Sequence, residues 1–193
     1  MSSYILHITL QERKPLNERV IQMNDTLTFE KLAHAICLLY GFSGEHLREF
    51  RDQDNLFVNH PDFNTDVEYD ADFSDPEFQD LQGLPHNVSA KTYLLSDYFA
   101  HHDTISFAYD FGENWRFTIT KQKVQDEKLE NDIKVISGSG SYLIEDSGGP
   151  EGLRGHLDNY ARQERDPDGR ETREDFVERI QPAMRQFDIH KYQ

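Results

Sequence analysis

Residues 105–121 read ISFAYDFGENWRFTITK and predict a β-hairpin. Large apolar side chains take every second position on both sides of a short polar turn. Successive side chains of a strand point to opposite faces, so this alternation places the large ones on one face of a sheet. The turn, DFGEN at 110–114, supplies the Asp, Gly and Asn that tight reversals favour. The large apolar residues are Ile105, Phe107, Tyr109, Trp115, Phe117 and Ile119.

The first forty residues predict two strands followed by a helix. The strands are expected at 4–10 and 19–23. Apolar residues then recur at helical spacing through 29–40, with Thr26 or Thr28 capping the start of the helix and Gly41 ending it. The apolar face of this helix must be buried against the hairpin. The order strand, strand, helix predicts an α+β fold with a β-grasp-like ββα opening.

The rest of the chain extends the sheet. Further strands are predicted at 46–50, 56–58, 91–95 and 133–136. Ser96 and Asp97 favour a short helical turn before the hairpin, and SGSGS at 137–141 predicts a flexible loop. The sheet is therefore expected to be mixed or antiparallel and packed by helices.

Two helices are predicted at the C-terminal end. One follows Pro150, and the second begins with a capping pattern at Thr172 and is broken or restarted at Pro182. The length of the chain suits one domain. We predict a single domain, 1–193, with a C-terminal helical part at 150–193.

Composition changes between Asp52 and Ala90, where the sequence has no Lys or Arg. Asp and Glu recur there among Pro, Asn and Phe, with too few aliphatic residues for a core. A calcium loop and an acidic mimic of nucleic acid are the functional alternatives, but the EF-hand spacing of ligands is absent. We predict an acidic surface excursion at 59–90.

Charge limits the partners of this protein. Asp and Glu number 36 against 20 Lys and Arg, a formal net charge of −16. Such a charge repels phosphate backbones and anionic membranes, and no basic cluster offers a surface for duplex DNA. The expected partner is a protein or peptide, in particular a basic one, and not nucleic acid. With no apolar stretch that could span a membrane and no signal-peptide pattern, the predicted location is cytoplasmic.

Several kinds of active site have no basis in the sequence. The one cysteine, Cys37, excludes an intramolecular disulfide and a zinc site built from cysteines, and its place in a predicted helix indicates a buried thiol. The sequence has no H-E-x-x-H, no G-x-S-x-G and no P-loop. Zincin, α/β-hydrolase and nucleotide-hydrolase chemistry are therefore not expected.

Three motifs together resemble the plasmid pRiA4b ORF-3-like family. They are HLREF at 46–50, YDFGENW at 109–115 and EDSGG at 145–149, in the order and approximate spacing that the family has. The likeness covers most of the chain apart from the acidic excursion. The resemblance implies the α+β fold, an activity that is unassigned, and an association with plasmids or other mobile elements.

The chain also departs from the family pattern. Glu113 takes the place of the usual Asp, and Leu143 and Ile144 replace a pair of prolines. A cysteine that often occurs in the preceding loop is missing. A role that depends on that cysteine or on those prolines is therefore not expected here.

The acidic residues of the last two motifs have a structural and a functional interpretation. In the structural one they hold the hairpin turn and cap the helix after Pro150. In the functional one they converge near Trp115 and form a ligand site or a site for Mg²⁺, Mn²⁺ or Ca²⁺. The candidate binding residues are Tyr109, Asp110, Trp115, Glu145, Asp146, Gly148 and Gly149, and the candidate metal ligands are Asp110, Glu113, Glu145, Asp146 and His156.

Two functions follow from these alternatives. The first is a non-catalytic binding module that uses the Tyr109–Trp115 surface and has no cofactor. The second is a metal-assisted hydrolase that uses Asp110, Glu145 and Asp146 with a divalent metal. In both cases we expect residues 145–149 to lie against the hairpin, with Trp115 or Tyr109 covering their backbone and Asp146 capping the next helix.

Overall fold

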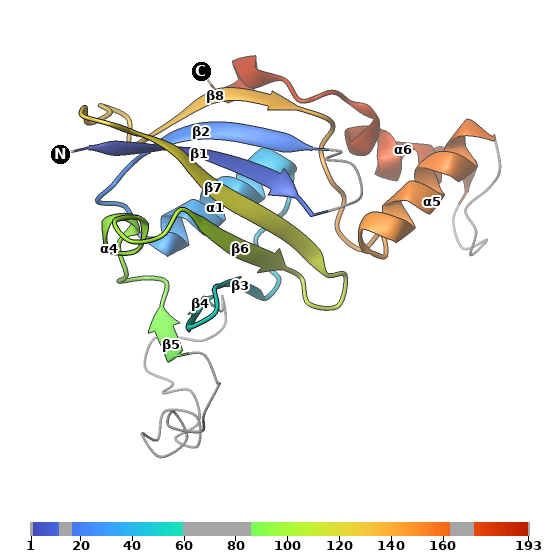
Figure 1. The fold of residues 1–193 in the computed structure, drawn as a ribbon. Coiled ribbons are helices and arrows are strands. Elements are labelled where there is room, and N and C mark those ends of the chain that lie inside the picture. The colour runs from blue at the N-terminus through green and yellow to red at the C-terminus, as the bar shows by residue number, and fades with distance from the viewer. Residues whose placement is uncertain (1, 12–16, 60–85, 163–171, 193) are drawn as a thin grey trace.

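The computed structural model describes residues 2–11, 17–59, 86–162 and 172–192. The predicted acidic excursion lies for the most part outside these residues. Within them the chain forms a mixed eight-stranded sheet in the order β5-β4-β3-β6-β7-β1-β2-β8, together with four helices (Figure 1). All neighbouring strands are antiparallel except β4 and β5, which are parallel. The predicted α+β class with a mixed sheet is confirmed.

The central hairpin forms as predicted and connects the two halves of the sheet. β6 pairs with β7 in a register that places Phe107 opposite Phe117 and Tyr109 opposite Trp115. β7 then pairs with β1, and β6 with β3. The strands are β1 (Ser3–Leu10), β2 (Glu18–Asn24), β3 (Arg48–Arg51), β4 (Asn55–Asn59), β5 (His86–Ser89), β6 (Thr104–Tyr109), β7 (Trp115–Gln125) and β8 (Ile133–Ser139).

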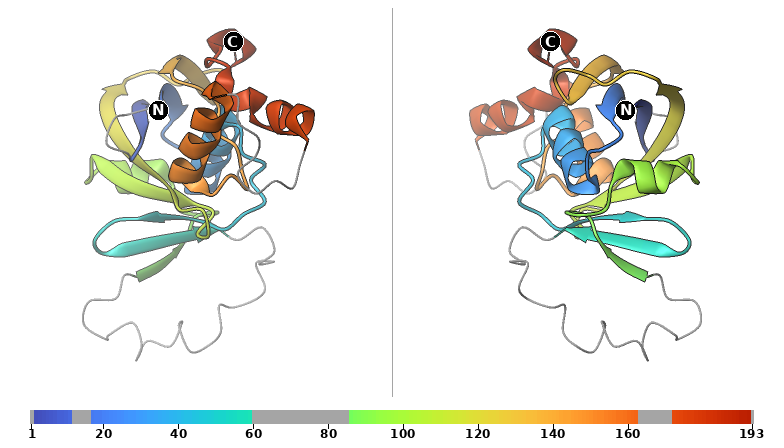
Figure 2. Two further views of the ribbon diagram at one scale, coloured as in Figure 1. Left: turned by 90° about the vertical axis from the view of Figure 1, so that its right-hand side faces the viewer. Right: turned by 90° about the vertical axis from the view of Figure 1, so that its left-hand side faces the viewer.

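Helix α1 (Phe29–Tyr40) covers one face of the sheet (Figures 1 and 2). The Thr28 hydroxyl accepts a hydrogen bond from the backbone N–H of Lys31, and Gly41 ends the helix in the left-handed conformation, with φ of 92°. Both signals are the ones that the sequence predicted. Burial raises the pKa of the Cys37 thiol in this helix to about 12, so the thiol stays protonated and inert at neutral pH.

Helices α5 (Gly149–Ala161) and α6 (Arg173–Met184) lie beyond one end of the sheet (Figure 1). The Thr172 side chain caps α6, as predicted. The expected break at Pro182 does not occur: the helix continues for two residues and ends at Met184, since a proline in the last turn removes only one hydrogen bond. A 3-10 helix, η1 (Ile189–Tyr192), follows.

Two further local predictions are wrong. Residues 91–95 do not form a strand: a turn leads into the short helix α4 (Leu95–Phe99), while the backbone of His86–Ser89 pairs with β4. Residues 137–139 belong to β8 and not to a loop, because pairing with β2 holds this glycine-containing segment. None of the helices in the described part of the chain is long and apolar enough to cross a membrane.

Candidate functional site

The turn of the β6–β7 hairpin is held by its own aspartate. Asp110 has φ of 52° and Asn114 has φ of 61°, so both lie in the left-handed region that tight reversals require. One Asp110 oxygen accepts the backbone N–H groups of Gly112, at 3.1 Å, and Glu113, at 3.3 Å. The other lies 3.4 Å from Nδ1 of His46. The Asp110 carboxylate therefore stabilises the turn.

The second motif lies directly against this turn, as the sequence predicted. One Glu113 oxygen accepts the backbone N–H groups of Gly148 and of Gly149, the latter at 3.1 Å. The other oxygen accepts the indole Nε1–H of Trp115 at 2.9 Å. These N–H groups open α5, so a carboxylate from the hairpin caps a helix that lies far along the chain. We refer to residues 110–114 and 145–149 together as the motif junction.

Glycine is required at one position of the motif junction. A Cβ atom on Gly149 would lie 2.1 Å from the backbone oxygen of Glu113. Its φ of 69° also belongs to the left-handed region. The predicted cover over this backbone by Trp115 or Tyr109 is replaced by close contact with the backbone of Glu113.

Glu145 connects the motif junction to the segment after α1. One of its oxygens accepts hydrogen bonds from the Tyr109 hydroxyl, from the Ser43 backbone N–H at 2.9 Å and from the Ser43 hydroxyl at 3.1 Å. The Tyr109 hydroxyl in turn accepts the backbone N–H of Gly44 at 3.0 Å. Burial and the hydrogen bond to Glu145 raise the pKa of Tyr109, so the hydroxyl remains a donor.

Asp146 does not have the capping role that the sequence predicted. It is exposed and has φ of 56°, and the N-cap residue of α5 is Gly148, which has no side chain to offer. Glu113 already binds the first N–H groups of that helix. The carboxylate of Glu113, from a distant part of the chain, therefore caps α5 in place of Asp146.

The proposed metal ligands do not gather. Among the residues that the structure describes, no three His, Cys, Asp or Glu side chains form a group that could hold a metal ion. His156 lies on α5 beside α6, with its ring centroid 5.9 Å from that of Phe176. The Nδ1 atom of His156 is buried without a hydrogen-bond partner in this part of the chain. In each of Asp110, Glu113 and Glu145, at least one carboxylate oxygen accepts the hydrogen bonds already described.

The predicted aromatic binding surface is not on the surface. Tyr109 and Trp115 are 0% exposed, and Phe42 packs on both, with ring centroids 4.5 Å and 5.6 Å away. Their strand positions point to the same side as Phe107 and Phe117, which line the core. Both rings therefore contribute to stability and are not accessible to a partner.

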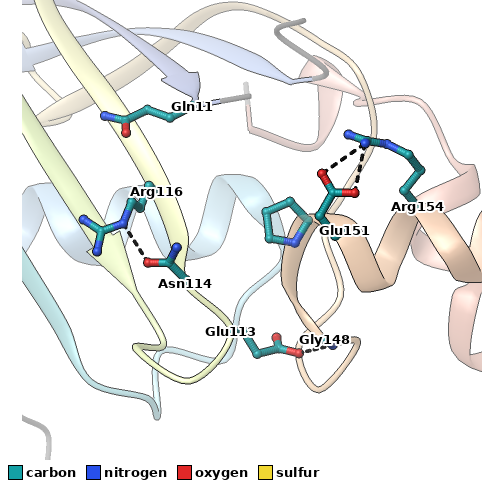
Figure 3. Close-up of a pocket in the computed structure, with 8 residues that line it drawn as sticks. Gln11, Glu113, Asn114, Arg116, Gly148, Glu151 and Arg154 are labelled. Carbon is teal, nitrogen blue, oxygen red and sulfur yellow. Dashed lines mark hydrogen bonds and ion pairs between the residues drawn. The ribbon is translucent and has the colours of Figure 1, made fainter. Parts of the chain in front are cut away.

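An open hollow of about 860 Å³ lies beside the motif junction, between the hairpin and α5 (Figure 3). Arg116 flanks it on the hairpin side, where its Nε donates to Oδ1 of Asn114 at 2.6 Å. On the α5 side, Arg154 donates to both oxygens of Glu151 at 3.1 Å. The hollow is lined by Gln11, Glu113, Asn114, Arg116, Gly148, Pro150, Glu151 and Arg154.

Sequence reasoning missed most of this lining. Gln11 follows the end of β1, and its Nε2 donates to Oγ1 of Thr118 at 2.9 Å, a contact with β7 that no local pattern indicates. Arg116 had a weak signal, because it alternates with buried Trp115 and Phe117 and so faces outward. The alternation predicts that the Arg116 side chain is exposed, but it does not predict which residues face that side chain across the hollow.

Replacing Glu113 with glutamine is expected to lower the free energy of unfolding by about 1.5 kcal/mol, because an amide offers one acceptor where the carboxylate uses two. Asp146→Asn is the matched control, since it removes the same charge, and we expect a change within about 0.5 kcal/mol. Urea unfolding followed by Trp115 fluorescence measures both. A larger loss in Asp146→Asn than in Glu113→Gln would reverse the assignment of the cap.

Comparisons with known proteins agree with the fold and the motifs. A family model described as "Plasmid pRiA4b ORF-3-like protein" matches residues 2–192. Among solved structures, the crystal structure of a protein of unknown function, MM3350 from Methanosarcina mazei Go1, is similar over 91% of this chain and 87% of that chain. The identity is 24% and the TM-score 0.66, a likeness of fold. No curated protein matches the chain.

Proposed function

The chain belongs to the plasmid pRiA4b ORF-3-like family, and from that premise we propose that it is a non-catalytic module that binds a segment of another protein. The binding site in this proposal is the hollow between the hairpin and α5 (Figure 3). We also propose a link to mobile genetic elements, because the description of the family names a plasmid. The cytoplasm is the expected compartment.

The observation that carries the proposal is the hollow itself. Its volume of about 860 Å³ is suited to a short peptide segment. Its walls come from the end of β1, from the hairpin and from α5, and these walls are joined by the Glu113 cap and by the Gln11 contact with β7. A site that is held in shape before binding loses little entropy when a ligand enters.

The chemistry of the lining favours a peptide. The side-chain amides of Gln11 and Asn114 each combine donors with an acceptor, as the peptide backbone does. Arg116 on one side and the Glu151–Arg154 pair on the other offer charges of both signs to the side chains of a bound segment. A lining of this kind is typical of the polar part of a protein interface.

The charge of the whole protein favours a basic partner. The formal net charge of −16 gives a negative field around the molecule. Such a field accelerates the encounter with a positively charged protein and slows the approach of nucleic acid. We therefore propose a segment of a basic protein as the occupant of the hollow.

The carboxylates do not favour the hydrolase alternative. A general acid or base has to reach a substrate proton with a group that is not already engaged. In Asp110, Glu113 and Glu145, at least one oxygen accepts backbone or side-chain hydrogen bonds that hold the fold. These bonds account for Asp110, Glu113 and Glu145 without catalysis. Asp146, the remaining residue of the hydrolase alternative, is exposed and belongs to no group of described residues that could hold a metal ion.

The proposal is tested with peptides selected from a random displayed library on the wild-type protein. We expect selected peptides rich in Lys and Arg. The double variant Gln11→Ala with Glu151→Ala removes an amide that can pair with a peptide backbone and a carboxylate that can meet a Lys or Arg side chain. It should raise the Kd of these peptides at least about tenfold, which is roughly 1.4 kcal/mol. Lys134→Ala, an exposed change on β8 at the other end of the sheet, is the control and should leave Kd unchanged. Equal affinity for both variants, or a library that yields no binder, would refute the site.

A further inference from the structure

A second hollow, of about 450 Å³, lies where the C-terminal segment meets the end of α1. Its lining is partly apolar, with Tyr142, Ile144 and Pro182, and it also carries Glu145 and the two cations Arg185 and Lys191. The volume is within the range of small-molecule sites. It shares no lining residue with the hollow of Figure 3.

The lining carries two cations and one carboxylate, a positive balance in a strongly acidic protein. The Nζ atom of Lys191 lies 5.3 Å from the centroid of the Tyr142 ring. The Arg185 guanidinium donates to Oε1 of Gln181, a neutral amide. Across the described residues neither cation forms an ion pair. Two cations that face one hollow without a carboxylate partner form a receptor for an anion.

The carboxylate that lines the hollow is directed to other partners. Glu145 is part of the lining, and one of its oxygens accepts the hydrogen bonds of Tyr109 and Ser43. The last carbonyls of α1 also have partners: the backbone N–H of Leu143 donates to the Tyr40 oxygen at 2.8 Å. Asp188, between the two cations in the sequence, accepts the backbone N–H of His190 at 3.0 Å. Among the described residues neither Glu145 nor Asp188 forms an ion pair with Arg185 or Lys191, so the two cations outnumber the one carboxylate in the lining.

The chain that carries the two cations is held by the packing of the C-terminal segment. The backbone N–H of Phe187 donates to the Gly140 oxygen at 2.7 Å, and the Phe187 ring stacks on Tyr192 with 5.4 Å between centroids. The Tyr192 hydroxyl lies 3.3 Å from that of Tyr142. The backbone that carries Arg185 and Lys191 is thus fixed on both sides of the hollow.

We propose that this second hollow binds a small organic anion with an apolar body, its carboxylate or phosphate group lying between Arg185 and Lys191. The planar guanidinium of Arg185 suits two oxygens of either group. The apolar body contacts Tyr142, Ile144 and Pro182, so the ligand gains from burial as well as from charge. The site is independent of the proposed peptide site.

Benzoate, phenyl phosphate and the neutral analogue benzamide test the proposal in thermal unfolding of the full chain. At about ten times its Kd, a bound anion should raise the Tm by roughly 3–6 °C. Benzamide should give no rise. A rise with benzoate alone assigns a carboxylate ligand, a rise with phenyl phosphate alone assigns a phosphate, and a rise with both supports the shared chemistry.

The double variant Arg185→Gln with Lys191→Met should lose the rise, because both cations are removed at exposed positions. Arg51→Gln with Lys134→Met removes the same charge at exposed positions outside both hollows, and this variant should keep the rise in Tm. Calorimetric titration of the same probes gives a second readout that does not depend on unfolding. No rise with either anion, a rise equal to that of benzamide, or a rise that the Arg185 and Lys191 variant retains would overturn the proposal.

Discussion

Replacing Gly149 with alanine is expected to lower the free energy of unfolding by about 4 kcal/mol, and the Tm by roughly 8–16 °C. The added Cβ would lie 2.1 Å from the backbone oxygen of Glu113, where no flexible side chain can move aside. The left-handed φ of 69° adds a cost for any residue with a side chain. Since the N–H of Gly149 also donates to the Glu113 carboxylate, a shift that relieves the clash breaks the cap.

Gly155 provides the matched control in the same helix. A Cβ on Gly155 meets nothing within 4 Å. Gly155→Ala should therefore raise the free energy of unfolding by up to about 1 kcal/mol, since alanine is the better helix former. Calorimetric scans of both variants measure the contrast. A Gly149→Ala protein that unfolds at the wild-type temperature would show that the motif junction is not required for stability.

The elements that sequence predicted well are those decided by local chemistry. Alternation along residues 105–121 forced six large side chains to one face, and all six are in the core. Thr28 marks the start of α1 and Gly41 marks its end, because a capping hydroxyl and a left-handed glycine each act within one turn of the helix. In these cases the physical cause lies within a few residues of its effect.

The candidate site was predicted less well because its contacts join distant segments. A cap for α5 was assigned to Asp146, the acid nearest the helix in sequence, whereas the carboxylate that binds the helix belongs to Glu113, 35 positions before Gly148. The prediction that Tyr109 and Trp115 form a binding surface was wrong for a different reason. Tyr109 and Trp115 share the alternation that buries Phe107 and Phe117, so they cannot also face a partner.

Arg19 is a further residue that the sequence did not single out, although its place in the alternation was informative. It precedes Ile21 and Met23 on the inward side of β2, and all three are 0% exposed. An inward arginine is expensive to bury unless every donor finds an acceptor. No carboxylate forms an ion pair with it among the described residues.

Backbone carbonyls take the place of that carboxylate. The Arg19 guanidinium donates to the oxygens of Leu39 at 3.2 Å, Ser139 at 2.6 Å and Ser141 at 3.1 Å, and also to that of Glu18 at 2.8 Å. Burial lowers the pKa of Arg19, but its ordinary value is so high that the group remains charged. It therefore connects the end of α1 with the chain that leaves β8.

Aromatic rings enclose the same guanidinium. Its carbon lies 4.6 Å from the centroid of Tyr40 and 3.8 Å from that of Phe187. Phe187 leads into η1, which carries Lys191 at the second hollow. The position of the C-terminal segment therefore depends on a residue in the second strand of the chain.

Arg19→Met should lower the free energy of unfolding by about 4 kcal/mol and the Tm by roughly 8–16 °C, because it leaves one buried and three partly buried carbonyls without this donor and removes the group that packs on Tyr40 and Phe187. Arg19→Lys should lose less, since an ammonium keeps the charge and part of the hydrogen bonding. Arg116→Met, at an exposed position, is the control and should change stability by no more than about 0.5 kcal/mol. Urea titrations measure the free energies of unfolding of the three variants and so give their order of stability. If Arg19→Met were as stable as Arg116→Met, the four carbonyls would be satisfied without the guanidinium, and the C-terminal segment would not depend on it.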